Sequence, residues 1–209
     1  MISILIVDDH FLVRKGLKKI LEDEVNNVIV YEAIDGNDLM KKIHAEKFDM
    51  IICDISMPGR SGLELLEQIK KEYPKLPVLM LSFYPEDQYA VRVLKAGASG
   101  YISKDSASEE LSKAIRQVLI GRRYISENLV EKLASNLDTN NNKDLHESLS
   151  NREFDVLKMI ASGKKISDIA VILSLSVNTI STYRFRILEK MKLKNNAEIM
   201  HYVISNKII

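Results

Sequence analysis

Five polar residues in the first half of the chain could together bind a cation and transfer a phosphoryl group. Asp8 and Asp9 follow one short apolar run, and Asp54, Ser82 and Lys104 come at the ends of three later runs. Three carboxylates in one cleft repel one another, so the site needs a cation, and an all-oxygen site with few protein ligands suits Mg²⁺. Asp54 would be the nucleophile toward a phosphoryl group. The metal ion and Lys104 would offset charge on the phosphoryl oxygens, and Ser82 would donate a hydrogen bond to one of them.

The elements that must position these residues are five apolar runs that alternate with amphipathic stretches over residues 1–120. The runs are short, rich in Ile, Val and Leu, and typical of buried parallel strands. They are Ser3–Val7, Val28–Tyr31, Met50–Cys53, Val78–Leu81 and Gly100–Ile102. The stretches between them have the apolar spacing of helices packed on a sheet. This pattern predicts a doubly wound parallel five-stranded α/β sandwich, which binds ligands at the carboxyl ends of its strands. A single Asp or Lys there is more often a solvated turn residue, so the prediction depends on their joint placement.

The last part of the chain, residues 146–209, predicts helices only. Ser150 and Glu153 have the spacing of a capping box, which begins a helix. Gly163 is a stop signal at the end of that helix. Three further helices are expected over Ile166–Leu173, from the cap Ser176 to Met191, and over Ala197–Ser205. Short helices joined by tight turns predict an all-α, four-helix helix-turn-helix domain.

Residues 121–145 are expected to join the domains 1–120 and 146–209. A short helix is predicted from Ser126 to about Leu133. The Asn-rich stretch after it cannot bury enough apolar area to fold alone, which predicts a flexible linker. Arg122 and Arg123 are interpreted as a solvated turn rather than a DNA contact.

The charge of the chain is uneven, although its net value is only +1. Residues 1–120 hold 16 Lys and Arg against 19 Asp and Glu, whereas residues 146–209 hold 10 against 6. A polyanion is therefore expected at the C-terminal end. Cys53 is the only cysteine, so there is no intrachain disulfide, and the thiol is expected to be buried in a cytoplasmic protein. No apolar run approaches about 18 residues, which predicts no membrane span.

The third helix of the C-terminal domain is the candidate DNA-reading element. A helical wheel places four residues on its core side: Val177, Ile180, Ile187 and Met191. The opposite side carries Asn178, Ser181, Thr182, Phe185 and Arg186. Such a polar face is more often merely solvated, but the tight turn before the helix and the net basic domain favour a recognition helix in a major groove.

Residues 1–120 resemble response-regulator receivers, which have a flavodoxin-like fold. The matching segments are Ile6–His10, Cys53–Gly62, Leu81-Ser82 and Lys95–Lys104. The resemblance implies that Asp54 is phosphorylated from a sensor histidine kinase, either simple or hybrid within a phosphorelay. It implies that Asp8, Asp9, Asp54 and the backbone carbonyl of Ser56 hold Mg²⁺. It also implies that Ser82 and Tyr101 form a switch pair, with Tyr101 rotating inward. The surface that this switch remodels is then expected to form a homodimer. A bulky Tyr84, two residues past Ser82, favours a longer-lived phosphate.

The chain from Leu149 resembles the LuxR/GerE-type DNA-binding domain, and both domains together resemble the NarL/FixJ class. The carrying residues are Leu149-Ser150, Arg152-Glu153, Val156-Leu157, Gly163, Ile169-Ala170, Leu173, Leu175-Ser176, Thr179-Ile180-Ser181, Ile187 and Lys190-Met191. The run Ser181–Arg186 is most similar to the BvgA/EvgA branch. By resemblance, bases are faced by Ser181, Thr182 and Phe185. Phosphate contact or support of the helix on DNA is expected from Thr179, Arg184, Arg186 and Lys190.

Three departures from the LuxR/GerE pattern limit what can be carried over. Ser181 and Tyr183 replace a common Lys and His, so the base preference does not transfer. Lys165 stands where a Ser or Thr cap often begins the second helix. Phe185 is apolar on an exposed face, where it either touches thymine methyls or packs on a partner domain.

These resemblances predict a phosphorylation-switched transcription factor acting on double-stranded promoter DNA, with RNA polymerase as a further partner. A haloacid-dehalogenase-type phosphohydrolase also uses an aspartyl phosphate. Such enzymes usually carry a second Asp two residues after the nucleophile, where this chain has Ser56 or His10. We therefore expect no enzyme activity beyond phosphorylation and dephosphorylation of Asp54 itself. A constitutive DNA binder with a vestigial receiver is the other alternative, and the complete set of acidic and switch positions argues against it.

Overall fold

The computed structural model describes residues 1–84, 86–126, 129–130, 145–206 and 208–209. The chain divides into two compact units, Met1–Asp138 and Thr139–Ile209, and each is described by itself. Most of the predicted linker 121–145, and most of the short helix predicted from Ser126 to Leu133, lies outside the described residues. None of the described helices is by itself long and apolar enough to cross a membrane.

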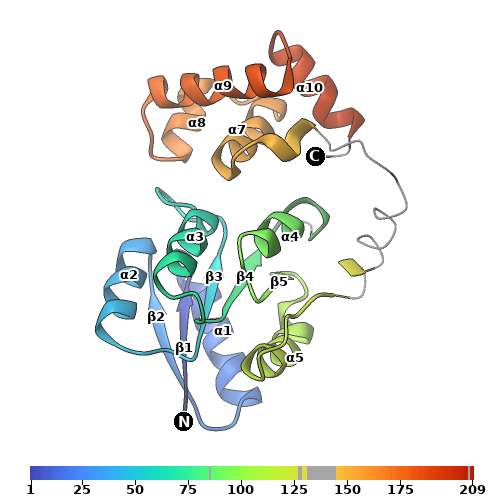
Figure 1. Cartoon of the computed structure of the whole chain (residues 1–209). Helices are drawn as coiled ribbons and strands as arrows, with labels where there is room; N and C mark the ends of the chain where they lie inside the picture. The colour runs from blue at the N-terminus through green and yellow to red at the C-terminus, as the bar shows by residue number, and fades with distance from the viewer. Residues whose placement is uncertain (85, 127–128, 131–144, 207) are drawn as a thin grey trace. The chain divides into compact units, whose positions relative to one another are not determined.

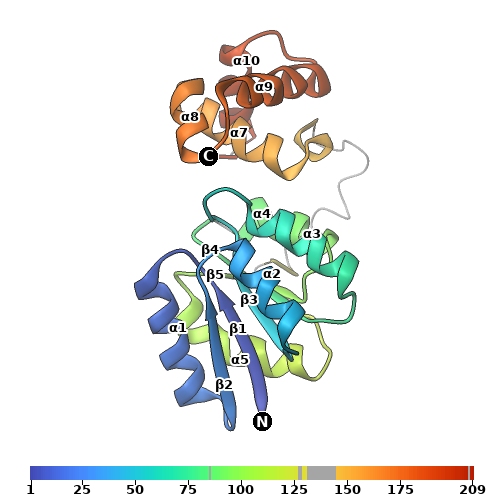
Figure 2. The same cartoon turned by 90° about the vertical axis from the view of Figure 1, so that its left-hand side faces the viewer.

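The first unit is a five-stranded parallel sheet in the order β2-β1-β3-β4-β5, with helices on both faces (Figures 1 and 2). The strands are β1 Ile2–Val7, β2 Val28–Ala33, β3 Met50–Asp54, β4 Val78–Ser82 and β5 Gly100–Ser103. The helices between and after them are α1 Phe11–Glu24, α2 Gly36–Ala45, α3 Gly62–Glu72, α4 Glu86–Lys95 and α5 Ala107–Leu119. The predicted doubly wound fold is confirmed. The strand order reverses between β1 and β3, which is where such folds place their ligands.

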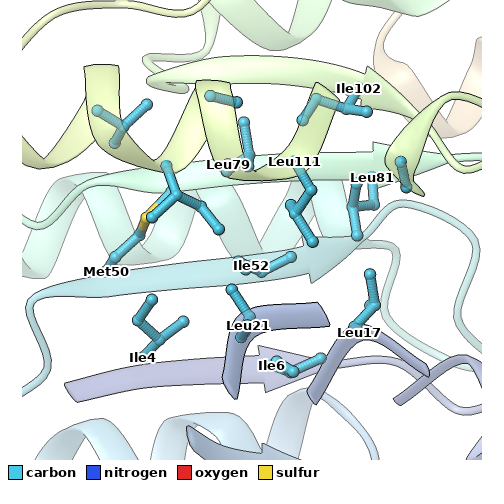
Figure 3. Packing of buried hydrophobic residues seen from close by; sticks show 14 of the residues in the cluster. Ile4, Ile6, Leu17, Leu21, Met50, Ile52, Leu79, Leu81, Ile102 and Leu111 are labelled. Carbon is cyan, nitrogen blue, oxygen red and sulfur yellow. The ribbon is translucent and has the colours of Figure 1, made fainter. Parts of the chain in front are cut away.

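One layer of the core of this unit lies between the sheet and the helices α1 and α5. Alternate strand residues such as Ile4, Ile6, Met50 and Ile52 meet Leu21 of α1 (Figure 3). All five are fully buried, and burying one such side chain contributes about 1.5–3 kcal/mol. The carboxyl ends of the strands are thus held by a tightly packed layer.

Two boundaries differ slightly from the predicted ones. Asp54 and Ser82 are the last residues of β3 and β4 rather than the residues after them, because each still pairs with the neighbouring strand. The packed unit also continues past residue 120. The backbone N–H of Tyr124 donates to the carbonyl of Ser99, and its buried ring joins the core.

The second unit begins with a short 3-10 helix, η1 Leu145–Ser148, and four α-helices follow it. They are α7 Asn151–Ala161, α8 Ile166–Ile172, α9 Val177–Met191 and α10 Asn196–Ser205. The predicted capping box is present at α7, where Ser150 and Glu153 satisfy each other's backbone N–H groups. Ser176 caps α9 as predicted, whereas Lys165 supplies no side-chain cap to α8. The four-helix prediction is confirmed.

Candidate functional site

The strand ends of the first unit bring three carboxylates and one imidazole together. Ligand atoms of Asp8, Asp9, His10 and Asp54 all lie within 4.8 Å of one another. Asp8 and Asp54 are almost fully buried, whereas the side chain of Asp9 is 28% exposed. The cluster therefore combines two buried carboxylates with one that is partly exposed to solvent.

Lys104 closes one side of this cluster. Its ammonium lies 2.6 Å from Oδ2 of Asp8 and 2.9 Å from Oδ2 of Asp54, and its side chain is only 4% exposed. The backbone N–H of Lys104 donates to the carbonyl of Ser82, which fixes the start of the loop after β5. Residues 8, 54 and 104 are thus joined by direct charge contacts, as the sequence predicted.

The carboxylate of Asp54 is incompletely satisfied in this setting. Oδ2 of Asp54 has its charge contact with Lys104, and Oδ1 of Asp9 lies 3.0 Å from Nδ1 of His10, but neither of these atoms nor Oδ1 of Asp54 has a partner in full hydrogen-bonding geometry among the described residues. Burial raises the pKa of Asp54, and the nearby Lys104 opposes that rise only in part. One ammonium does not offset the charge of three clustered carboxylates, so the residues present fit a divalent metal ion in addition to Lys104.

The backbone next to Asp54 is held by a close approach of Gly62, the first residue of α3. A Cβ atom at Gly62 would lie 1.9 Å from the carbonyl oxygen of Asp54, so only glycine fits there. Ser61 caps the same helix together with Glu64 in a second capping box. Ser56, whose carbonyl is a metal ligand by the resemblance to receivers, is exposed in the turn between Asp54 and this cap.

Cys53 precedes Asp54 and is fully buried, which confirms the prediction for this residue. Burial, with the charges of Asp54 and Asp8, raises the pKa of the Cys53 thiol. The thiol therefore stays neutral, and it donates to the carbonyl of Asp54. Cys53 is a packing residue of β3.

The two predicted switch residues are both buried, at 0% exposed for Ser82 and 1% for Tyr101. They meet at the backbone of Tyr84. The N–H of Tyr84 donates to Oγ of Ser82 at 3.0 Å, and the Tyr101 hydroxyl donates to the carbonyl of Tyr84 at 2.5 Å. Tyr101 thus lies inward, behind the Ser82 side of the pocket.

Arg14 and His10 are site residues that sequence reasoning did not assign. The Arg14 guanidinium is buried, and it donates to the carbonyl of Asp8 at 2.7 Å and to Glu32 at 3.4 Å, which fixes the turn after β1. The sequence did contain a signal for the role of Arg14. Arg14 shares the buried face of α1 with Leu17 and Leu21, where a lone charge is unexpected.

The second unit contains the geometry of a helix-turn-helix. The axes of α8 and α9 are bent by 112° across the turn of residues 173–176. This angle falls in the range of about 90–120° found for DNA-reading helix pairs. Ser174 takes a left-handed conformation (φ 53°) in this turn.

The outer face of α9 is exposed as predicted, at Asn178, Ser181, Thr182, Phe185 and Arg186. Its core side is confirmed by three fully buried residues, Ile180, Ile187 and Met191.

The core assignment of Val177 was wrong, because 51% of its side chain is exposed. Val177 is the first residue of α9, and its neighbours Ser176 and Asn178 are exposed as well.

Three residues expected to contact phosphate or support α9 on DNA have partners inside the domain. Thr179 Oγ1 lies 2.8 Å from Oγ of the cap Ser176, and Nε of Arg184 donates to Oδ1 of Asn196 at 2.6 Å. Lys190 Nζ donates to Oε2 of the buried Glu153 at 2.6 Å. These contacts favour the supporting role and leave the exposed Arg186 as the candidate for direct phosphate contact.

Arg122 and Arg123, outside α9, are exposed residues next to the end of α5, as expected of a solvated turn.

Comparison with known proteins assigns each half of the chain to a described family. Residues 4–116 match the model described as "Response regulator receiver domain", and residues 147–203 match "Bacterial regulatory proteins, luxR family". Both matches agree with the resemblances drawn from the sequence.

Several relatives match over nearly the whole chain. Response regulator UvrY of Escherichia coli K12 is 37% identical over 98% of this chain and 94% of its own length. Response regulator GacA of Pseudomonas aeruginosa is 37% identical over 95% of this chain and 94% of its own. The likeness of Ser181–Arg186 to the BvgA/EvgA branch stays a prediction.

Solved structures of RcsB share the architecture. RcsB from Salmonella enterica serovar Typhimurium, bound to promoter rprA with the phosphomimetic BeF3-, is 28% identical, with a TM-score of 0.68 over 98% of this chain and 100% of that chain. A structure of two RcsB dimers bound to two parallel DNAs is 27% identical, with a TM-score of 0.61 over 98% of both chains.

Proposed function

Because the chain belongs to the NarL/FixJ-type response regulators, which join a receiver to a LuxR-type DNA-binding domain, we propose that phosphorylation of Asp54 controls its binding to promoter DNA. Proteins of this family are two-component transcriptional regulators. The phosphoryl donor is a sensor histidine kinase. We place the reaction in the cytoplasm, where promoter DNA is available.

The single observation that carries the proposal is the convergence of Lys104 on Asp8 and Asp54. These residues are far apart in sequence, yet one ammonium lies within 2.9 Å of both carboxylates in a nearly dry pocket. An oxygen of Asp54 attacks phosphorus, and the bond from phosphorus to the donor's imidazole nitrogen breaks. Lys104 can then move from the carboxylate to the phosphoryl oxygens, where negative charge has increased.

A divalent ion, Mg²⁺ by the oxygen-rich donor set, would be held by Asp8, Asp9, Asp54 and the backbone carbonyl of Ser56. When bound, it supplies positive charge to the phosphoryl oxygens. Arg14 keeps the carbonyl of Asp8, and hence the turn that carries both aspartates, in a fixed position.

Phosphorylation reaches the rest of the receiver through Ser82 and Tyr101. A phosphoryl oxygen offers the Ser82 hydroxyl a strong, charged acceptor. The backbone of Tyr84 joins both residues, so a shift of Ser82 changes the environment of Tyr101 at the face of α4, β5 and α5. A bias of a few kcal/mol between two states is enough to expose a dimer surface there.

Two copies are expected to bind a two-fold symmetric DNA site through α9. Ser181, Thr182 and Phe185 would face bases, and Arg186 would contact phosphate, with Thr179, Arg184 and Lys190 holding the helix. Bound promoters would be regulated through RNA polymerase. The protein turns over no outside substrate, since its chemistry ends with formation and loss of the phosphate on Asp54.

The test compares wild type with Asp54→Asn after treatment with acetyl phosphate and Mg²⁺. We expect the mass of one phosphate, dimer formation by light scattering and tighter binding to a selected duplex in wild type only. Asp23→Asn, which changes an exposed carboxylate on α1, is the matched control and should respond like wild type. An Asp54→Asn protein that still dimerised and bound DNA like treated wild type would contradict the proposal.

A further inference from the structure

His10 lies directly against the acidic cluster and has no other described side-chain partner. Its Nδ1 atom lies 3.0 Å from Oδ1 of Asp9 and 3.2 Å from Oδ1 of Asp8. The residue is the N-cap of α1 but makes no side-chain cap there, and its side chain is 58% exposed. Its imidazole therefore serves neither the helix nor the core.

The spacing of these atoms is the spacing of neighbouring ligands around one metal ion. Ligands at right angles, each about 2.1 Å from an octahedral ion, are separated by about 3.0 Å. The distances of 3.0 and 3.2 Å from Nδ1 to the two carboxylate oxygens agree with this value. The corresponding atom of Asp54 completes the cluster within 4.8 Å.

The buried carboxylates of the cluster each have one oxygen paired with the ammonium of Lys104, and Oδ1 of Asp8 accepts a hydrogen bond from the backbone N–H of His10 at 2.7 Å. Lys104 contacts Oδ2 of Asp8 and Oδ2 of Asp54, whereas His10 faces the Oδ1 atom of Asp8. Oδ1 of Asp54 is buried, and it has no partner in hydrogen-bonding geometry among the residues that the structure describes. This buried, unsatisfied oxygen is an independent sign that a cation belongs in the cluster that His10 shares with Asp8, Asp9 and Asp54.

We infer that His10 is a nitrogen ligand of this metal site. The site therefore binds imidazole-preferring ions such as Ni²⁺ and Zn²⁺ through His10, a residue that Mg²⁺ does not need. The inference rests on the proposed function, because it uses the same metal site. Imidazole suits Ni²⁺ and Zn²⁺, while Mg²⁺ prefers oxygen ligands and water. His10 would thus decide which divalent ions compete for the receiver.

The direct test is pulsed electron paramagnetic resonance of the full chain loaded with Mn²⁺. We expect modulation from an imidazole ¹⁴N nucleus in wild type and its loss in His10→Gln. His44→Gln is the matched control, because His44 also pairs with a carboxylate, Glu72, but on the surface between α2 and α3. The control should keep the nitrogen signal. A wild-type spectrum without ¹⁴N coupling, or one unchanged by His10→Gln, would overturn the inference.

Calorimetry separates a ligand from a residue that merely orients Asp9 by a hydrogen bond. A ligand predicts that His10→Gln weakens Ni²⁺ binding by about tenfold or more and Mg²⁺ binding by less than about twofold. Equal weakening of both ions would assign His10 an orienting role and overturn the inference. Asp9→Asn should weaken both ions, and circular dichroism of each variant checks that the fold is retained.

Failure of the proposed function would look different. In that case wild-type Asp54 would take no phosphoryl group from acetyl phosphate with Mg²⁺, whatever His10 does. If phosphorylation proceeds with Mg²⁺ while the nitrogen signal is absent, only the role of His10 is wrong.

Discussion

The hydroxyl of Tyr101 donates a hydrogen bond to the backbone carbonyl of Tyr84 at 2.5 Å. Tyr84 is also fixed by its ring, which stacks on the ring of Tyr89 in α4 at 4.7 Å and an interplanar angle of 15°. One loop residue thus joins β4, α4 and β5, which are the elements that have to move together if phosphorylation is to be sensed at a distance.

The first prediction concerns this bond. Tyr101→Phe keeps the buried ring and removes the donor, so we expect the receiver to lose about 1 kcal/mol of unfolding free energy and its loop after β4 to loosen. The backbone N–H of Tyr84 should then exchange with solvent faster, as read by hydrogen exchange. Tyr124→Phe, which alters a buried tyrosine in the same unit but outside this loop, is the control. Unchanged exchange at Tyr84 in Tyr101→Phe would contradict this account.

The second prediction uses two glycines of the receiver. Gly62→Ala places a Cβ atom 1.9 Å from the carbonyl oxygen of Asp54, so the backbone must shift, and we expect a loss of at least about 3 kcal/mol together with loss of phosphorylation. Gly16→Ala meets nothing within 4 Å inside α1 and should gain about 1 kcal/mol. Urea unfolding measures both changes. Similar stabilities for the two variants would show that the contact at Gly62 relaxes without cost.

The third prediction is a pH dependence of the DNA-binding unit. Burial by itself raises the pKa of Glu153, but hydrogen bonds from Lys190 and Ser150 outweigh it, so the pKa lies below its ordinary value of 4.5. A depressed carboxyl pKa gives stability that is fully present above pH 4.5 and is lost as the pH falls through the folded-state value. We therefore expect the unit to weaken in acid below pH 4.5.

Amide NMR signals of α7 and α9 report the unfolding of this unit separately from the unfolding of the receiver. Glu153→Gln should flatten the dependence of stability on acid pH. Lys190→Met should lower the free energy of unfolding by about 1–2 kcal/mol at neutral pH, because the buried Glu153 carboxylate loses its half-exposed partner. Glu189→Gln changes an exposed carboxylate of the same helix and should keep the wild-type profile. The mechanism is wrong if Glu153→Gln keeps that profile too.

Residue types and periodicity were enough to predict the sheet, the four C-terminal helices and the meeting of Asp8, Asp54 and Lys104. Parallel strands end at one edge of a sheet, so the position of a residue along its strand already fixes its neighbours. The contact of Lys190 with Glu153 was not predictable in this way. It depends on how α9 crosses α7, and the helical wheel of α9 does not contain that angle.

Val177 and Arg14 show the same limit in opposite directions. An apolar residue in phase with the core can still be exposed at the first position of its helix, as Val177 is in α9. A charged residue in phase with the core can be buried when a backbone carbonyl accepts its hydrogen bond, as the carbonyl of Asp8 does from Arg14. Periodicity reports the face of a helix, while burial also depends on where the helix ends and what lies opposite.

The last prediction decides between the two roles left open for Phe185, whose side chain is 65% exposed on the outer face of α9. Thr182, one turn earlier, donates its hydroxyl to the carbonyl of Asn178, so its hydrogen is not offered to a base. An aromatic ring beside such a residue favours contact with a thymine methyl group. We expect duplexes selected from a random library by the treated protein to carry thymine at one fixed position in each half-site.

Replacing that thymine by uracil removes only the methyl group. The change should weaken wild type about fourfold, as expected for burial of one carbon, and should leave Phe185→Ala unaffected. Arg186→Ala is the matched control, because loss of a phosphate contact weakens all sequences alike and reduces the salt dependence. If wild type binds the uracil duplex as tightly as the thymine duplex, and Phe185→Ala changes domain packing instead, the ring belongs to a protein contact and the base preference arises elsewhere on α9.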